Sequence, residues 1–276
     1  QAKERGLLPL YPDDRVFPAI NHLVAWIFAG GSIIGETFVP TFSIDKVNHQ
    51  PILAKALSTL DLDCELVRRE EYEDRLDAGL EARAQPGPII GRMLHALGAP
   101  RGKKTGQSYS LPEYLNRIHP RHQRAFARVY LLFRGARSNE KSRGLIINTR
   151  RTKTFKGELK QFFEAQTGHD LTLAESGKLY VLEEAINALA GKHGDPKEGL
   201  LYRIAYGEED TPVTEEAFIN TYRGSYRNPW TVVQQYQAVK GRIETADNPA
   251  SVSASDIAKE IGGPSPRYYH WINNDS

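Results

Sequence analysis

The chain has 276 residues, of which 40% are hydrophobic and 25% are charged, and its formal net charge is +2. These values are typical of a globular protein with one large domain or two smaller ones, and no apolar run approaches the ~20 residues of a transmembrane helix. The single cysteine, Cys64, excludes an internal disulfide and a cysteine-ligated zinc cluster, and it favours a reducing interior compartment.

Charge is distributed unevenly along the chain. Residues 61–84 hold nine acids and four arginines, which we interpret as a solvated face. Residues 101–156 hold fifteen Lys or Arg and only two acids, Glu113 and Glu140. Such a basic block would release many counterions on meeting a phosphate backbone, so the sequence predicts a polyanionic partner.

The first hundred residues predict a helix followed by strands and further helices. Residues 16–30 carry an apolar stripe at helical spacing, which Gly30 and Gly31 bring to an end. The remaining elements expected here are strands at 33–38 and 41–47, a helix with Leu53, Leu57 and Leu60 on one side, a strand at 63–69, a charged stretch at 70–84 that fits either an exposed helix or a long hairpin, and a helix at 86–97.

A similar order follows in the next ninety residues. The pattern predicts a loop at 101–109, helices at 111–118 and 120–134, a strand at 144–149, a helix at 155–166, and a hairpin of 170–173 with 178–181. Pro112 and Pro120 suit the first turns of their helices. His119 and His122 flank Pro120 with no third ligand at suitable spacing, so we interpret them as surface or capping residues rather than metal ligands.

The repeated order indicates an internal duplication over roughly 16–190. We therefore expect an α+β fold with two pseudo-symmetric halves and antiparallel sheets. The expected domains are 1–100 for the first half, 101–190 for the second and 191–276 for a helical C-terminal module. Because both halves belong to one chain, a monomer is sufficient.

The C-terminal module carries the pattern of a helix-turn-helix. Residues 252–262 predict a short capped helix that ends at a glycine turn, and residues 264–271 predict another helix. The recognition helix would be about 265–273. Its outward side chains would be Arg267, Tyr268, His270 and Asn273.

Two segments, Leu23–Gly31 and Ala127–Gly135, are each an apolar helix that ends in glycine. They resemble the LAGLIDADG motif of homing endonucleases. Residues 90–115 contain a Leu-Gly-Ala-Pro turn, a Gly-Lys-Lys loop and a Leu-Pro element, and they are similar to the linker before the second motif in archaeal and intein-type members. The resemblance covers roughly 16–190 and implies αββαββα halves whose motif helices pack side by side under saddle-shaped sheets that straddle DNA.

The resemblance also implies where catalysis would occur. Family members carry a metal-binding acid at the penultimate motif position, which is Gly30 in one copy and Arg134 in the other. Ala25 and Ala29 suit close packing of the first helix, whereas Val129 and Phe133 stand where small residues are usual, so we expect a looser or shifted interface. Since two-metal hydrolysis needs carboxylates, no residue is assigned to catalysis or metal binding and no cofactor is expected.

The leading hypothesis is a sequence-specific double-stranded DNA-binding protein on a catalytically inactive scaffold. Some bacterial sporulation regulators pair a degenerate domain of this kind with a helix-turn-helix, so the resemblance implies a transcriptional or replication role in the cytoplasm, associated with the nucleoid (or inside an organelle). One alternative is an active, Mg²⁺-dependent homing endonuclease that recruits Glu36 or Asp45. Others are an RNA-binding maturase or ribosome-associated protein, and a structural role in a larger assembly.

The residues expected to contact DNA come from the basic block and from the recognition helix. They are Lys103, Lys104, Lys141, Arg143, Arg150, Arg151, Lys153, Lys156, Arg267, Tyr268, His270 and Asn273. Sequence does not distinguish phosphate contacts from base contacts among them.

Overall fold

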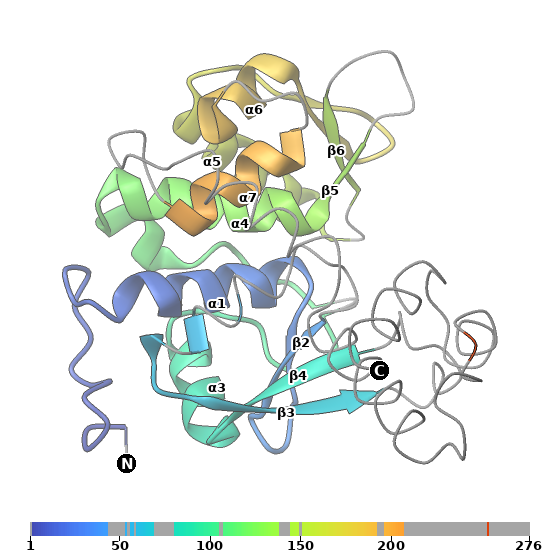
Figure 1. Ribbon diagram of the computed structural model, residues 1–276. Coiled ribbons are helices and arrows are strands. Elements are labelled where there is room, and N and C mark those ends of the chain that lie inside the picture. The colour runs from blue at the N-terminus through green and yellow to red at the C-terminus, as the bar shows by residue number, and fades with distance from the viewer. Residues whose placement is uncertain are drawn as a thin grey trace.

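The structure, a computed structural model, describes residues 2–43, 53, 56–57, 59–68, 80–104, 107–137, 144–148, 151–191, 196–206 and 253. Within these residues the fold is α+β, with two four-stranded antiparallel sheets and helices packed around them (Figure 1). The expected α+β fold with two halves is therefore confirmed.

The first half begins with a helix that is apolar on all sides, as is typical of a buried helix. Its elements are α1 (Phe17–Ala29), β1 (Ser32–Ile33), β2 (Pro40–Ser43), β3 (Asp63–Arg68), β4 (Leu80–Gln85) and α3 (Gly87–Ala96). The strands lie in the order β1-β2-β4-β3, and the register places Phe42 opposite Ala82. Leu53, Leu57 and Leu60, which predicted a helix, are buried in the same core.

The second half repeats this arrangement. Its elements are a short 3-10 helix η3 (Glu113–Arg117), α4 (Pro120–Arg134), β5 (Gly135–Arg137), β6 (Leu145–Asn148), α5 (Lys153–Thr167), β7 (Thr172–Leu173), β8 (Lys178–Val181), α6 (Glu183–Ala190) and α7 (Pro196–Tyr206). The strands lie in the order β5-β6-β8-β7. This is the order of the first sheet with each strand replaced by its counterpart, so the two halves share one topology.

Helices α1 and α4 lie side by side, run in the same direction and end on the side where strands β2 and β5 are found (Figure 1). Near their starts, buried Asn21 donates its amide N–H to the carbonyl of His122 at 2.9 Å and accepts a bond from the hydroxyl of Tyr114 at 2.7 Å. Toward their ends, Trp26 stacks on Phe133 with ring centroids 4.3 Å apart. Polar and aromatic contacts thus join the two halves.

The large residue at position 133 is accommodated by this stacking. Ala25, Ala29 and Val129 are fully buried, whereas Phe133 is partly buried and packs against the core through Trp26. The small residues of the interface therefore lie on α1, and the stacked pair of Trp26 and Phe133 packs beside them.

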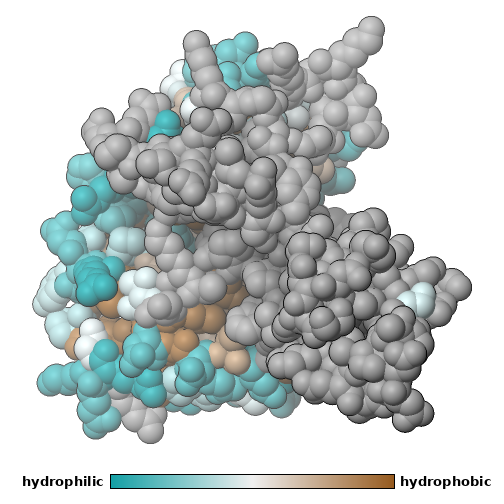
Figure 2. Space-filling view, in the orientation of Figure 1, coloured by the Kyte–Doolittle hydropathy of each residue, from teal (hydrophilic) through white to brown (hydrophobic). Residues whose placement is uncertain are grey.

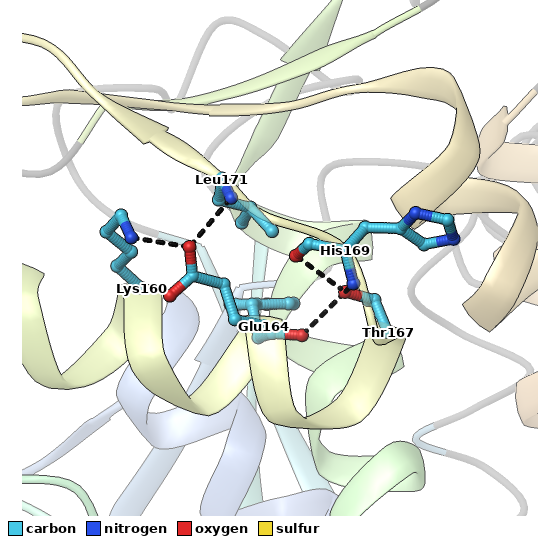
Figure 3. Close-up of polar contacts among 6 residues, drawn as sticks. Lys160, Glu164, Thr167, His169 and Leu171 are labelled. Carbon is cyan, nitrogen blue, oxygen red and sulfur yellow. Dashed lines mark hydrogen bonds and ion pairs between the residues drawn. The ribbon is translucent and has the colours of Figure 1, made fainter.

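Helix α5 ends as capping rules predict, at Gly168 with φ 71°. Figure 3 shows the polar contacts that join this end to the following strand. The carboxylate of Glu164 accepts bonds from the Lys160 amine at 2.5 Å and from the Leu171 amide at 2.8 Å, while the hydroxyl of Thr167 donates to the carbonyl of Phe163. These bonds fix the entry into β7.

Several expected boundaries were wrong. The strand expected at 33–38 is only two residues long, because residues 35–37 form a turn and Phe38 adopts a left-handed φ of 59°. The helix expected at 111–118 is a 3-10 helix over 113–117. In the charged stretch 70–84, β4 occupies residues from 80 onward, and residues 70–79 lie outside the described part. Helices α6 and α7 were not predicted.

Hydrophilic residues cover much of the described surface in Figure 2, and one hydrophobic area lies low in that view. None of the helices described has the length and apolar composition to cross a membrane. The predicted helix-turn-helix at 252–273 lies outside the described residues, apart from Ser253.

Candidate nucleic-acid interface

The two central helices end in glycines that the packing requires. A Cβ on Gly31 would lie 2.7 Å from the carbonyl oxygen of Thr41, and one on Gly135 would lie 2.6 Å from the carbonyl oxygen of Leu131. Close-packed interiors do not tolerate such approaches. Both glycines stand where a central helix meets the first strand of its sheet, so Gly30 and Arg134 occupy equivalent positions.

These two positions differ in what they offer. Gly30 is exposed, and a Cβ there would meet no atom within 4 Å. Arg134 is partly buried, and its Nε is buried with no hydrogen-bond partner in the described part of the chain. The first helix therefore ends in open space and the second ends in a cation, with no carboxylate at either place.

Lys104 lies in the linker between the halves and caps the C-terminal end of α1. Its Nζ donates to the carbonyls of Ile27 and Gly31, at 2.5 Å each. Carbonyls at the end of a helix lack partners within the helix, and a cation there complements the helix dipole. Burial of the amine, and then the nearby charges of Arg151 and Arg134, lower the pKa of Lys104 from 10.5 to about 7.

Tyr109 lies beside the same cations. The Arg151 guanidinium carbon is 5.4 Å from the centre of the Tyr109 ring, which also packs against Phe155 at 5.0 Å and Phe28 at 5.7 Å. Burial raises the pKa of Tyr109, so its hydroxyl stays protonated at neutral pH. That hydroxyl is buried and has no partner among the described residues. We call Lys104, Tyr109, Arg134 and Arg151 the end cluster.

Helix α5 holds the linker in place next to the end cluster. The carboxylate of Glu158 accepts a bond from the Ser110 hydroxyl at 2.9 Å and from the Leu111 amide at 3.0 Å. Arg151 directly precedes the N-cap of this helix, Thr152, whose hydroxyl accepts a bond from the amide of Phe155. The remaining free N–H groups of this first turn add positive potential near Arg151 and Tyr109.

The outward face of the first sheet is acidic in its described part. Phe42, Ala82 and Ala84 are fully buried, and because side chains alternate along a strand, their neighbours face the other way. The charged residues on that outer face are Asp63, Glu65, Glu81 and Arg83. A phosphate backbone is repelled by such a face.

The second sheet has a different outward face. Leu145, Ile147, Leu179 and Val181 point into the core. The residues paired on the other face of β6 and β8 are Ile146, Asn148, Lys178 and Tyr180, with no acid among them. The two sheets therefore share a topology and differ in charge, which makes the second half and the end cluster the side suited to a polyanion.

Five of the twelve residues predicted to contact DNA are described. Lys103 and Lys153 are exposed, Lys104 and Arg151 belong to the end cluster, and Lys156 is half-buried on α5 with its amine next to Gly177. The other seven lie outside the described residues: Lys141, Arg143, Arg150, Arg267, Tyr268, His270 and Asn273. Their contacts with DNA remain predictions.

Tyr109 was not predicted from the sequence. The signal that would have identified it is an aromatic residue inside the basic linker. His122 was predicted to lie on the surface. His119 does cap α4, since its Nδ1 accepts from the amide of Arg121 at 3.2 Å. His122 instead is buried, with its ring 5.1 Å from that of Phe17. Its Nε2 accepts a bond from the Arg121 guanidinium at 3.1 Å, so packing on Phe17 is combined with a satisfied ring nitrogen.

Within the described residues, no group of three or more His, Cys, Asp or Glu side chains is placed to hold a metal ion. The sequence matches no protein-family model and no curated protein. Among solved structures, the chain is similar to full-length DUF199/WhiA from Thermatoga maritima, with a TM-score of 0.40 and 14% identity over 98% of this chain and 94% of that chain. A similarity of this size assigns no family.

Proposed function

We propose that this chain is a double-stranded DNA-binding protein on a LAGLIDADG-type scaffold that does not cleave its target. The observation that carries the proposal is the repeated strand order around two parallel helices, each ending in a required glycine, with Gly30 and Arg134 where the motif has its acids. Sequence-specific recognition and a regulatory role in transcription or replication are part of the proposal. They rest on the resemblance and on the predicted helix-turn-helix.

The chemistry at the helix ends opposes metal-dependent cleavage. Two-metal hydrolysis needs carboxylates that hold the ions between the attacking and leaving oxygens. Gly30 has no side chain, and the guanidinium of Arg134 would repel a divalent cation from the same region. Glu36, an acid considered for the endonuclease alternative, is exposed in the turn after β1, and Asp45 lies outside the described residues.

The charge difference between the sheets favours an asymmetric complex. A duplex held along the second sheet and the end cluster meets Lys178, Arg134 and Arg151, whereas the first sheet presents Glu65 in the middle of an acidic face. The second half would thus provide most of the phosphate contacts. The predicted C-terminal module would add affinity through its high effective concentration.

Two measurements test the proposal. Fluorescence anisotropy with a labelled duplex across a salt series should give an affinity that falls linearly on a log–log plot, and structured RNA should compete poorly. A supercoiled-plasmid assay with Mg²⁺ or Mn²⁺ should leave the plasmid intact. Absence of duplex binding at low salt would refute the proposal, and robust nicking would instead establish the endonuclease alternative.

A further inference from the structure

The end cluster contains buried hydrogen-bond donors that nothing in the described chain satisfies. They are the Nε–H of Arg134 and the hydroxyl of Tyr109. An unpaired buried donor is unfavourable by about 1–3 kcal/mol, so folded proteins rarely keep one without a ligand, a water or a functional reason. Two of them in one cluster indicate that the site is completed by an acceptor.

The cluster also brings like charges together. The charges of Arg134 and Arg151 both act on the amine of Lys104, and among the described residues no carboxylate is paired with either arginine. Mutual repulsion of this kind is relieved by an anion. The missing acceptor is therefore negatively charged.

We infer that the end cluster binds one phosphate group of the DNA backbone, held by Arg134, Arg151 and the hydroxyl of Tyr109, with Lys104 beside it. The assignment of this phosphate to the DNA backbone rests on the proposed function, whereas the anion site itself rests on the buried unpaired donors and on the position of Arg151 over the Tyr109 ring. The phosphate would take the place that metal ions and their acids occupy in the motif. The chain would thus bind the DNA backbone at the phosphate that a nuclease of this type cleaves.

The arrangement of the donors fits a tetrahedral anion better than a carboxylate. The donors come from three different segments, namely the linker, the end of α4 and the residue before the N-cap of α5. A phosphate offers oxygens in several directions and pairs well with guanidinium groups. The amide groups at the start of α5 add a further preference for phosphate.

The isolated site can be tested with inorganic sulfate, a tetrahedral anion whose charge stays constant across neutral pH. Replacing chloride by sulfate at equal ionic strength should raise the unfolding midpoint of the wild-type chain. Arg134→Gln and Arg151→Gln should each weaken sulfate binding about tenfold, in line with one charged hydrogen bond. Arg117→Gln, a matched change on the exposed 3-10 helix before the start of α4, should leave it unchanged.

A second arm uses labelled duplex DNA. Sulfate should compete with the duplex in the wild type, and the salt slope of duplex binding should fall by about one in Arg134→Gln. Equal sulfate effects in all variants would overturn the anion site even if duplex binding is normal. Sulfate binding without competition would overturn the backbone as its source. Sulfate binding with no duplex affinity at all would instead remove the proposed function and leave the site standing.

Discussion

The amine of Lys104 should make the stability of the folded chain depend on pH in a defined window. Its pKa is about 7 in the folded chain, because it is buried and lies near Arg151 and Arg134, and it returns to about 10.4 in the unfolded chain. Between these values the unfolded state binds more protons, so the free energy of unfolding rises with pH. One proton sets a limit of about 1.4 kcal/mol per pH unit.

Other groups restrict the useful range. The pKa of Cys64 is raised by burial and then by Asp63, so above about pH 8.5 its unfolded thiol ionises first and the free energy of unfolding falls. The pKa of His122 is lowered by burial and then by Arg121. Its effect on the free energy of unfolding therefore changes only below about pH 7 and is constant above that value. The window from about pH 7 to about pH 8.5 therefore reports mainly on Lys104.

Urea unfolding of Cys64→Ala at several pH values in this window should show a rise of about 1–2 kcal/mol. Adding Lys104→Met should flatten the profile, whatever it does to the absolute stability. Lys103→Met, which removes the exposed neighbouring amine, should keep the slope. Parallel profiles with and without Lys104 would show that its amine stays protonated in the folded chain, and the reasoning about its surroundings would be refuted.

Three further predictions test the fold and the charge asymmetry. Gly135→Ala should lower the free energy of unfolding by about 2–3 kcal/mol in urea unfolding because its Cβ would meet the carbonyl oxygen of Leu131, while Gly30→Ala should change it by less than about 1 kcal/mol. Glu164→Gln should lower the free energy of unfolding by about 1 kcal/mol at neutral pH. Since the hydrogen bond from the nearby lysine lowers the pKa of Glu164, the difference should vanish as pH falls through the folded pKa in the same assay. In duplex anisotropy, Lys178→Glu should weaken affinity about tenfold and Glu65→Lys should not weaken it, and the reverse result would place DNA on the first sheet.

The elements bounded by proline and glycine were predictable from the sequence. Helix α4 spans 120–134 as expected, because Pro120 begins it and Gly135 follows its last apolar turn. The hairpin of β7 and β8 was also expected and is confirmed. Short strands were less predictable, since an alternating pattern at 33–38 also fits a strand that ends at a turn, and the left-handed Phe38 appears only in the structure.

The candidate site was predictable in part. The two apolar helices that end in glycine, and the absence of an acid at Gly30 and Arg134, could be read directly because they are properties of short stretches of sequence. The contact of Lys104 with carbonyls more than seventy residues earlier could not, because spacing along the chain does not encode it. The same is true of Tyr109, whose importance depends on the contacts of its ring with Phe155 and Arg151 and on its unpaired buried hydroxyl.

The sequence by itself determined the twofold plan of this protein and its regional charge, since apolar periodicity, helix-ending glycines and basic composition are properties of short stretches of chain. Only the tertiary structure decided that, among the described residues, the outward face of the first sheet carries acids and the outward face of β6 and β8 does not. It alone also brought Lys104, Arg134 and Arg151 to one place. The physical reason is that strand register and helix packing, which set those neighbours, are fixed by burial of the whole core rather than by any local pattern.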